Sequence, residues 1–63
     1  MMTYTVKALS QLDYSVVDER KYFDEINARA KAMRMRDSQE YALCDIVIEV
    51  AKDGVVLTVI GGA

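Results

Sequence analysis

The chain has 63 residues, with eight Lys and Arg against ten Asp and Glu, one Cys, and no His, Pro or Trp. A chain of this length buries only about 60% of the surface that its unfolded form exposes, so we expect a single domain, residues 1–63, with one thin core. Because His is absent and Cys44 stands alone, a disulfide within the chain, a thiolate metal site and His-based catalysis are excluded. We therefore expect no catalytic residue, no metal ligand and no cofactor.

The composition also points to a folded protein outside the membrane. At 52% hydrophobic and 29% charged residues, the chain is too apolar and too balanced in charge for disorder. Its apolar runs are far shorter than the roughly 18 residues that span a bilayer. Residues 1–7 alternate in character and do not form the basic and apolar regions of a secretion signal, so we expect a cytoplasmic protein.

The N-terminal residues 3–9 alternate between apolar and polar side chains, which predicts a strand. The residues on its apolar face are Tyr4, Val6 and Ala8. Residues 10–17 leave two alternatives. Their apolar side chains also alternate, at Leu12, Tyr14 and Val16. They form either a short extra strand or a loop that covers one face of the sheet.

Residues 18–36 follow a helical period and predict one amphipathic helix. Apolar side chains recur at spacings of three, four and three, at Phe23, Ile26, Ala30 and Met33, with Tyr22 on the same edge. We expect this stripe to face the core and the opposite side, with Ala28, Ala32 and Met35, to face solvent. Ser15 or Asp18 is the expected N-cap, and the order of early acids and late cations suits the helix dipole.

Two β-branched runs, residues 41–51 and 55–60, flank Asp53-Gly54 and predict a hairpin with a two-residue type I′ turn. This turn pairs Lys52 with Val55, and the register continues along the strands in two sets. The expected core face pairs Val50 with Leu57 and Ile48 with Val59, and is extended by Ile46. The expected outer face pairs Ala51 with Val56, Glu49 with Thr58 and Val47 with Ile60, and adds Asp45 and Leu43.

These elements predict an α+β fold with the order β-α-β-β. Of the three strands, residues 55–60 carry no charge, whereas the other two carry Lys7, Asp45 and Glu49. Since charged side chains discourage stray pairing at the edges of a sheet, we expect the last strand in the middle of an antiparallel sheet of order 1-3-2. The helix is expected to cover the face that contains Ile46, Ile48, Val50, Val55, Leu57 and Val59.

The second face of this sheet is the first candidate binding surface, because it mixes apolar with polar residues where solvent would favour polar ones. Its expected members are Leu43, Val47, Glu49, Val56, Thr58 and Ile60. Three occupants are considered: a second copy of the chain, which would form a homodimer through the open sheet face, another protein, or the N-terminal part of the same chain. Self-association is favoured, because it adds buried area to a thin core.

A cationic cluster at the end of the helix is the second candidate surface. It consists of Arg29, Lys31, Arg34 and Arg36, and residues 27–36 contain no acid. On a helical wheel Arg29 and Arg36 lie on one flank of the apolar stripe, and the other two lie toward the opposite flank. These side chains are candidates for contacts with an anion or an acidic partner. Nucleic acid is less favoured, because the chain is acidic overall and the cations do not form one stripe.

The residues therefore favour a non-enzymatic protein-binding module that is dimeric, with a small nucleic-acid-binding regulator as the alternative. The layout resembles the very small proteins of phages and mobile elements, among them the anti-CRISPR inhibitors. The likeness is carried by the opening strand at Tyr4-Thr5-Val6, the Ala-rich helix around residues 28–33 and the closing hairpin at Lys52-Asp53-Gly54. It implies a stoichiometric inhibitor that binds the surface of a host nucleoprotein complex, and it assigns no functional residue.

Overall fold

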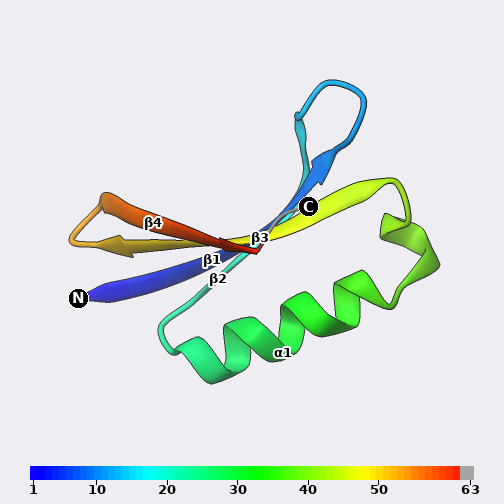
Figure 1. The fold of residues 1–63 in the computed structure, drawn as a ribbon. Helices are drawn as coiled ribbons and strands as arrows, with labels where there is room; N and C mark the ends of the chain where they lie inside the picture. The colour runs from blue at the N-terminus through cyan, green and yellow to red at the C-terminus, as the bar shows by residue number, and fades with distance from the viewer. Residues whose placement is uncertain (62–63) are drawn as a thin grey trace.

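A four-stranded antiparallel sheet and one helix form the two layers of the computed structural model, which describes residues 1–61 (Figure 1). The elements in chain order are β1 (Met2–Ser10), β2 (Val16–Tyr22), α1 (Glu25–Arg36), the 3-10 turn η1 (Gln39–Tyr41), β3 (Cys44–Lys52) and β4 (Val55–Gly61). The sheet order is β2-β1-β3-β4. The predicted α+β class with one helix on an antiparallel sheet is confirmed, whereas the prediction of three strands in the order 1-3-2 is wrong.

β1 and β3, the two strands that were expected at the edges because of their charges, lie in the middle of the sheet. β1 pairs with β2 on one side and with β3 on the other, and β4 pairs with β3 at the edge. Lys7 Nζ of β1 lies 3.0 Å from Glu49 Oε2 of β3, and both side chains are partly buried. Because each charge neutralises the other across the two strands, neither needs the solvent of an edge position.

Residues 16–22 form the additional strand β2, which replaces the first part of the predicted helix. A tight loop joins it to β1, in which the Tyr14 amide donates to Ser10 O at 2.8 Å and the Ser10 amide donates to Ser15 O at 2.9 Å. Leu12 is 92% exposed, and the loop extends beyond the sheet in Figure 1, so it does not cover a sheet face. β2 forms the second edge of the sheet and carries four consecutive charges, at Asp18, Glu19, Arg20 and Lys21.

The helix begins later than predicted, because Asp24 supplies its N-cap. Asp24 Oδ1 accepts a hydrogen bond from the Asn27 amide at 2.8 Å, which satisfies one of the free N–H groups of the first turn. The predicted caps, Ser15 and Asp18, lie in the β1–β2 loop and in β2. The predicted end at Arg36 is confirmed.

The face of α1 that packs on the sheet is the one expected to face solvent. Ala28, Ala32 and Met35 are fully buried, whereas Ile26 is 81% and Met33 62% exposed. Small alanine side chains let the helix backbone approach β1 and β3 closely, which the bulky stripe would prevent. The core cluster consists of Val6, Ala8, Ala28, Ala32, Met35, Ile46, Ile48 and Val50.

The predicted turn at Asp53-Gly54 is confirmed. Both residues have positive φ, 51° and 85°, as a type I′ turn requires. The first pairs beyond the turn, Lys52 with Val55 and Ala51 with Val56, are also as predicted.

Beyond those pairs a β-bulge in β4 makes the predicted register wrong. The partner of Val50 is Thr58, and Leu57 is left without a cross-strand partner of its own. The shift places Val59 opposite Glu49 and Ile60 opposite Ile48. Of the predicted core face, Ile46, Ile48 and Val50 are buried, whereas Val55, Leu57 and Val59 are exposed.

Candidate functional site

β4 is an apolar edge strand that the rest of the fold leaves uncovered. The exposed hydrophobic residues of the strand are Val55, Val56, Leu57 and Val59, each at least half exposed. The strand contains no charge and no Pro, and within residues 1–61 it pairs with β3 alone. Helix α1 packs mainly on β1 and β3, so it does not cover this strand. An uncharged edge presents free backbone N–H and C=O groups beside apolar side chains, which is a template for pairing with another strand.

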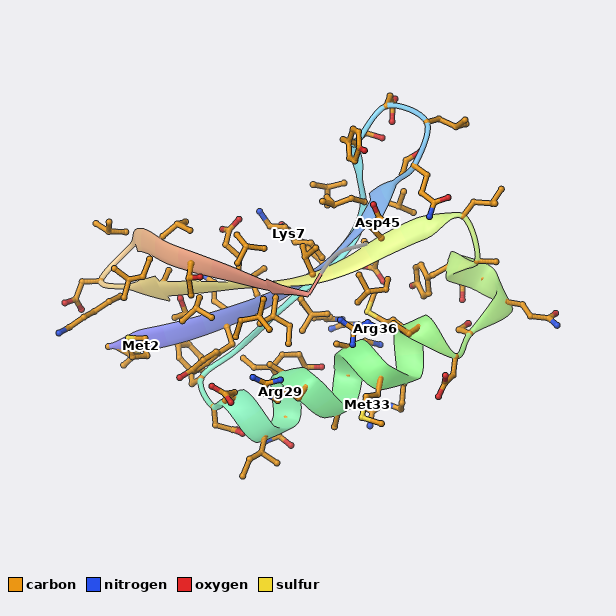
Figure 2. The ribbon with its side chains drawn as sticks, viewed as in Figure 1. Met2, Lys7, Arg29, Met33, Arg36 and Asp45 are labelled. Carbon is orange, nitrogen blue, oxygen red and sulfur yellow. The ribbon has the colours of Figure 1, made fainter. Side chains whose placement is uncertain are left out.

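The six residues predicted to form one partner-binding face lie on two different faces of the sheet and in the segment before β3. Val47, Glu49 and Val56 lie on the sheet face away from α1, as their register positions require. Figure 2 shows Lys7 on the side of the sheet opposite the helix, where its ammonium group pairs with Glu49. Thr58 and Ile60 lie on the helix side, because they pair with Val50 and Ile48. Leu43 precedes β3 and is exposed.

The outer side of α1 forms a second apolar surface, which we call the α1 ridge. It consists of Ile26, Ala30 and Met33, together with Phe23 next to the N-cap. Ile26, Met33 and Phe23 are all more than half exposed. Their spacing of three, four and three residues keeps the helical members on one face. The ridge is the stripe that periodicity identified, on the opposite side of the molecule from the one expected.

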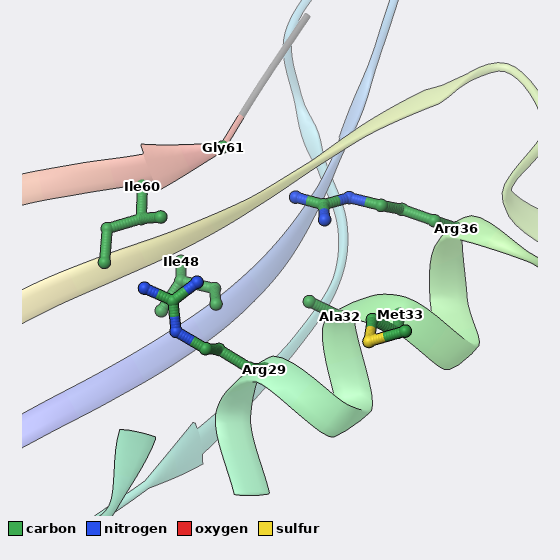
Figure 3. Close-up of a pocket in the computed structure, with 7 residues that line it drawn as sticks. All are labelled: Arg29, Ala32, Met33, Arg36, Ile48, Ile60 and Gly61. Carbon is green, nitrogen blue, oxygen red and sulfur yellow. The ribbon is translucent and has the colours of Figure 1, made fainter. Parts of the chain in front are cut away.

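Arg29 and Arg36 lie on one flank of α1, beside a pocket of about 290 Å³ between the helix and the end of β4 (Figure 3). The remaining lining residues are Ala32, Met33, Ile48, Ile60 and Gly61. Both guanidinium groups extend toward the strands in Figure 3. Arg36 Nη2 donates to Ile46 O at 3.3 Å, and Arg29 Nε lies 2.8 Å from Glu25 Oε2. The pocket therefore has a mainly apolar lining with two arginine side chains at its border.

Lys31 and Arg34 lie on the other flank, where they border a pocket of about 220 Å³. Its other lining residues are Met35, Ser38, Glu40 and Tyr41. Within residues 1–61 neither cation forms an ion pair. The four cations thus occupy two separate flanks of the helix, as the helical wheel indicates, with the α1 ridge between them.

Tyr41, which borders the pocket on this second flank, donates a hydrogen bond from its hydroxyl to Asp18 Oδ2 at 2.6 Å. This bond stabilises the charged carboxylate, so the pKa of Asp18 lies below its usual value. The same bond and the adjacent negative charge raise the pKa of Tyr41 to about 12. The pair connects η1 to β2 and fixes the segment that follows the helix.

Reactive and metal-binding groups are sparse in residues 1–61. Cys44 is a free thiol, partly buried against the core. No three His, Cys, Asp or Glu side chains in this part of the chain are grouped as metal ligands. None of the helices described has the length and apolar character needed to cross a bilayer. Comparison with family models, with curated proteins and with solved structures finds no match to this chain.

Proposed function

We propose that the chain is a non-enzymatic protein-binding module, and that β4 joins it to a second copy of itself. The observation that carries this proposal is the uncovered edge of β4, where four apolar side chains lie beside an unpaired backbone. Sheets whose edges must stay free usually place a charge, a Pro or a covering element there. β4 has no charge and no Pro, and no other element of the described residues covers it, although its bulge interrupts the regular ladder.

Two features favour a second copy as the occupant. Antiparallel pairing of β4 with itself about a two-fold axis brings apolar side chains together and opposes no like charges, because the strand is uncharged. The core of the monomer is also thin: three of its eight clustered residues are Ala. One strand pair is at the low end of interface sizes, so we expect a dissociation constant on the order of micromolar.

Besides the second copy, we propose a target of another kind, a host protein complex. The resemblance to small phage-encoded inhibitors supports a host defence complex as the target, with inhibition by surface contact. The nucleic-acid alternative has weaker support, because Arg29 and Arg36 are separated from Lys31 and Arg34 by the apolar α1 ridge. Phosphate binding favours cations that converge on one track.

Light scattering after gel filtration tests the dimer, over protein concentrations from about 1 µM to about 1 mM. We expect the mass to rise from monomer to dimer over this range. Leu57→Lys introduces a charge on the β4 edge and should keep the chain monomeric. Leu12→Lys makes the same change at an exposed site in the β1–β2 loop and should behave as the parent. A parent chain that stays monomeric throughout contradicts the proposal.

A further inference from the structure

We infer that the α1 ridge binds an acidic amphipathic helix of another protein. This inference rests on the proposed binding function and names a partner for it, but it uses a surface separate from β4. Of the ridge, Met33 borders the pocket that reaches Ile60 and Gly61, whereas the exposed apolar residues of β4, within residues 55–59, lie at the sheet edge. The two surfaces can therefore be tested independently.

The spacing of the ridge is that of a helix-pairing seam. Phe23, Ile26, Ala30 and Met33 follow one another at three, four and three residues, which is the spacing of the a and d positions in a coiled coil. The opposite side of α1 is held on the sheet by Ala28, Ala32 and Met35. A helix fixed by one face presents the other without an ordering cost, which favours binding.

The charges beside the seam determine which helix fits it. The flanking e and g positions of this heptad are occupied by Asn27 and Arg34 on one side and by Arg29 and Arg36 on the other. Glu25 satisfies one of the five N–H groups of Arg29, and the carbonyl of Ile46 accepts from Arg36. Both guanidinium groups extend toward the strands (Figure 3), so rotation of these exposed side chains has to bring their remaining N–H groups to a carboxylate at the seam. Arg34 forms no ion pair within residues 1–61 and needs no such release.

A second copy of the chain does not suit this seam. Pairing α1 with itself would bring Arg29, Arg34 and Arg36 against the same cations, in either helix orientation. Like charges at these positions act against self-pairing and select a partner with Glu or Asp there. Nucleic acid would offer phosphates to the cations but no apolar partner for Ile26 and Met33.

Two synthetic heptad-repeat peptides test the inference, both with Leu at a and d, one with Glu and the other with Lys at every e and g position. Like charges keep each peptide from pairing with itself. Amide NMR of the full-length chain should show the Glu peptide shifting the signals of residues 25–36, with binding about tenfold tighter than for the Lys peptide. Shifts confined to residues 55–61 would overturn the inference while leaving β4 as a binding edge.

Matched variants test separately the charged and the apolar contacts of the proposed binding. Arg34→Glu should weaken binding of the Glu peptide about three- to tenfold, whereas Lys21→Glu, an equal reversal of charge on β2, should leave the affinity unchanged. Ile26→Asn should weaken it about tenfold or more, and Leu12→Asn should not. All four changed residues are exposed, so we expect the fold to be retained, which circular dichroism checks.

Three further outcomes overturn the inference: equal affinity for the two peptides, binding of neither, or binding of duplex DNA at residues 25–36 while the Glu peptide fails. The last would support the nucleic-acid alternative. Light scattering on the same samples reports the β4 dimer, so loss of dimerisation with retained peptide binding, or the reverse, shows which proposal has failed.

Discussion

Truncation of two methionines in the same helix tests which face of α1 is buried. Met35 is 1% exposed and belongs to the core cluster, whereas Met33, two residues earlier, is 62% exposed. Met35→Ala and Met33→Ala make the same chemical change in nearly the same stretch of backbone. Differences in helix propensity therefore cancel between the two variants, and burial alone separates them.

The expected loss of stability at Met35 follows from its burial. Removing a fully buried Met side chain costs about 2–5 kcal/mol, because the transfer free energy is lost and a cavity remains. A domain of this length has a total unfolding free energy of roughly 3–9 kcal/mol. Met35→Ala should therefore remove at least about a fifth of the stability. Met33→Ala should change it by less than about 0.5 kcal/mol, since its side chain stays in water in both states.

Urea denaturation followed by circular dichroism at 222 nm measures both variants. With a slope of about 1 kcal/mol/M for so small a domain, a loss of about 2–3 kcal/mol moves the midpoint by roughly 2–3 M. All samples need the same protein concentration, because a dimer makes stability depend on concentration. A loss at Met33 equal to or larger than that at Met35 would refute the orientation of α1 and restore the periodic stripe as the buried face.

Two further predictions concern the backbone at the end of β4 and the link between η1 and β2. Gly61→Ala should lower the unfolding free energy by about 1–3 kcal/mol, because φ is +90° and the new Cβ would lie 2.6 Å from Arg36 Nη2 and 3.1 Å from the carbonyl oxygen of Ile46. Gly54→Ala, with φ of +85° but no atom within 4 Å, should cost less in the same urea titration. In a spectrophotometric titration at 295 nm, one of the four tyrosines should ionise near pH 12, and Asp18→Asn should return it toward pH 10. The raised pKa of Tyr41 favours the fold below about pH 10 and loses this effect by about pH 12, whereas the lowered pKa of Asp18 favours it above about pH 4 and loses this effect in acid.

Local signals in the sequence were sufficient wherever a few neighbouring residues determine the structure. The type I′ turn depends on Asp53 and Gly54 alone, and the alternation of residues 3–9 correctly identifies Val6 and Ala8 as core residues. The start of the helix was also encoded locally, in Asp24 with Asn27 three residues later. The apolar period extends back to Asp18, which lies in a strand, and therefore predicts a start that is too early.

The orientation of the helix and the order of the strands depend on contacts between distant residues. Periodicity marks an apolar stripe, but it does not distinguish a face that contacts the core from one that contacts a partner. Ala28 and Ala32 offer the sheet a closer approach than the stripe does, and this preference becomes visible only when β1 and β3 are in place. Likewise, the pairing of Lys7 with Glu49 across two strands makes a charged strand acceptable in the centre. The bulge at Leu57 then divides the predicted binding face.

The two edges of the sheet differ, and this difference determines how far an assembly can grow. A chain with two apolar edges could add copies without end, as fibrils do. Here a pair joined at β4 would form one continuous sheet whose outer edges are both β2, each with charges from Asp18 to Lys21. Further strands would have to pair beside these charges. In the proposed pair, growth would stop at two copies, and the uncharged edge of β4 would be buried between them, where it could not recruit further strands.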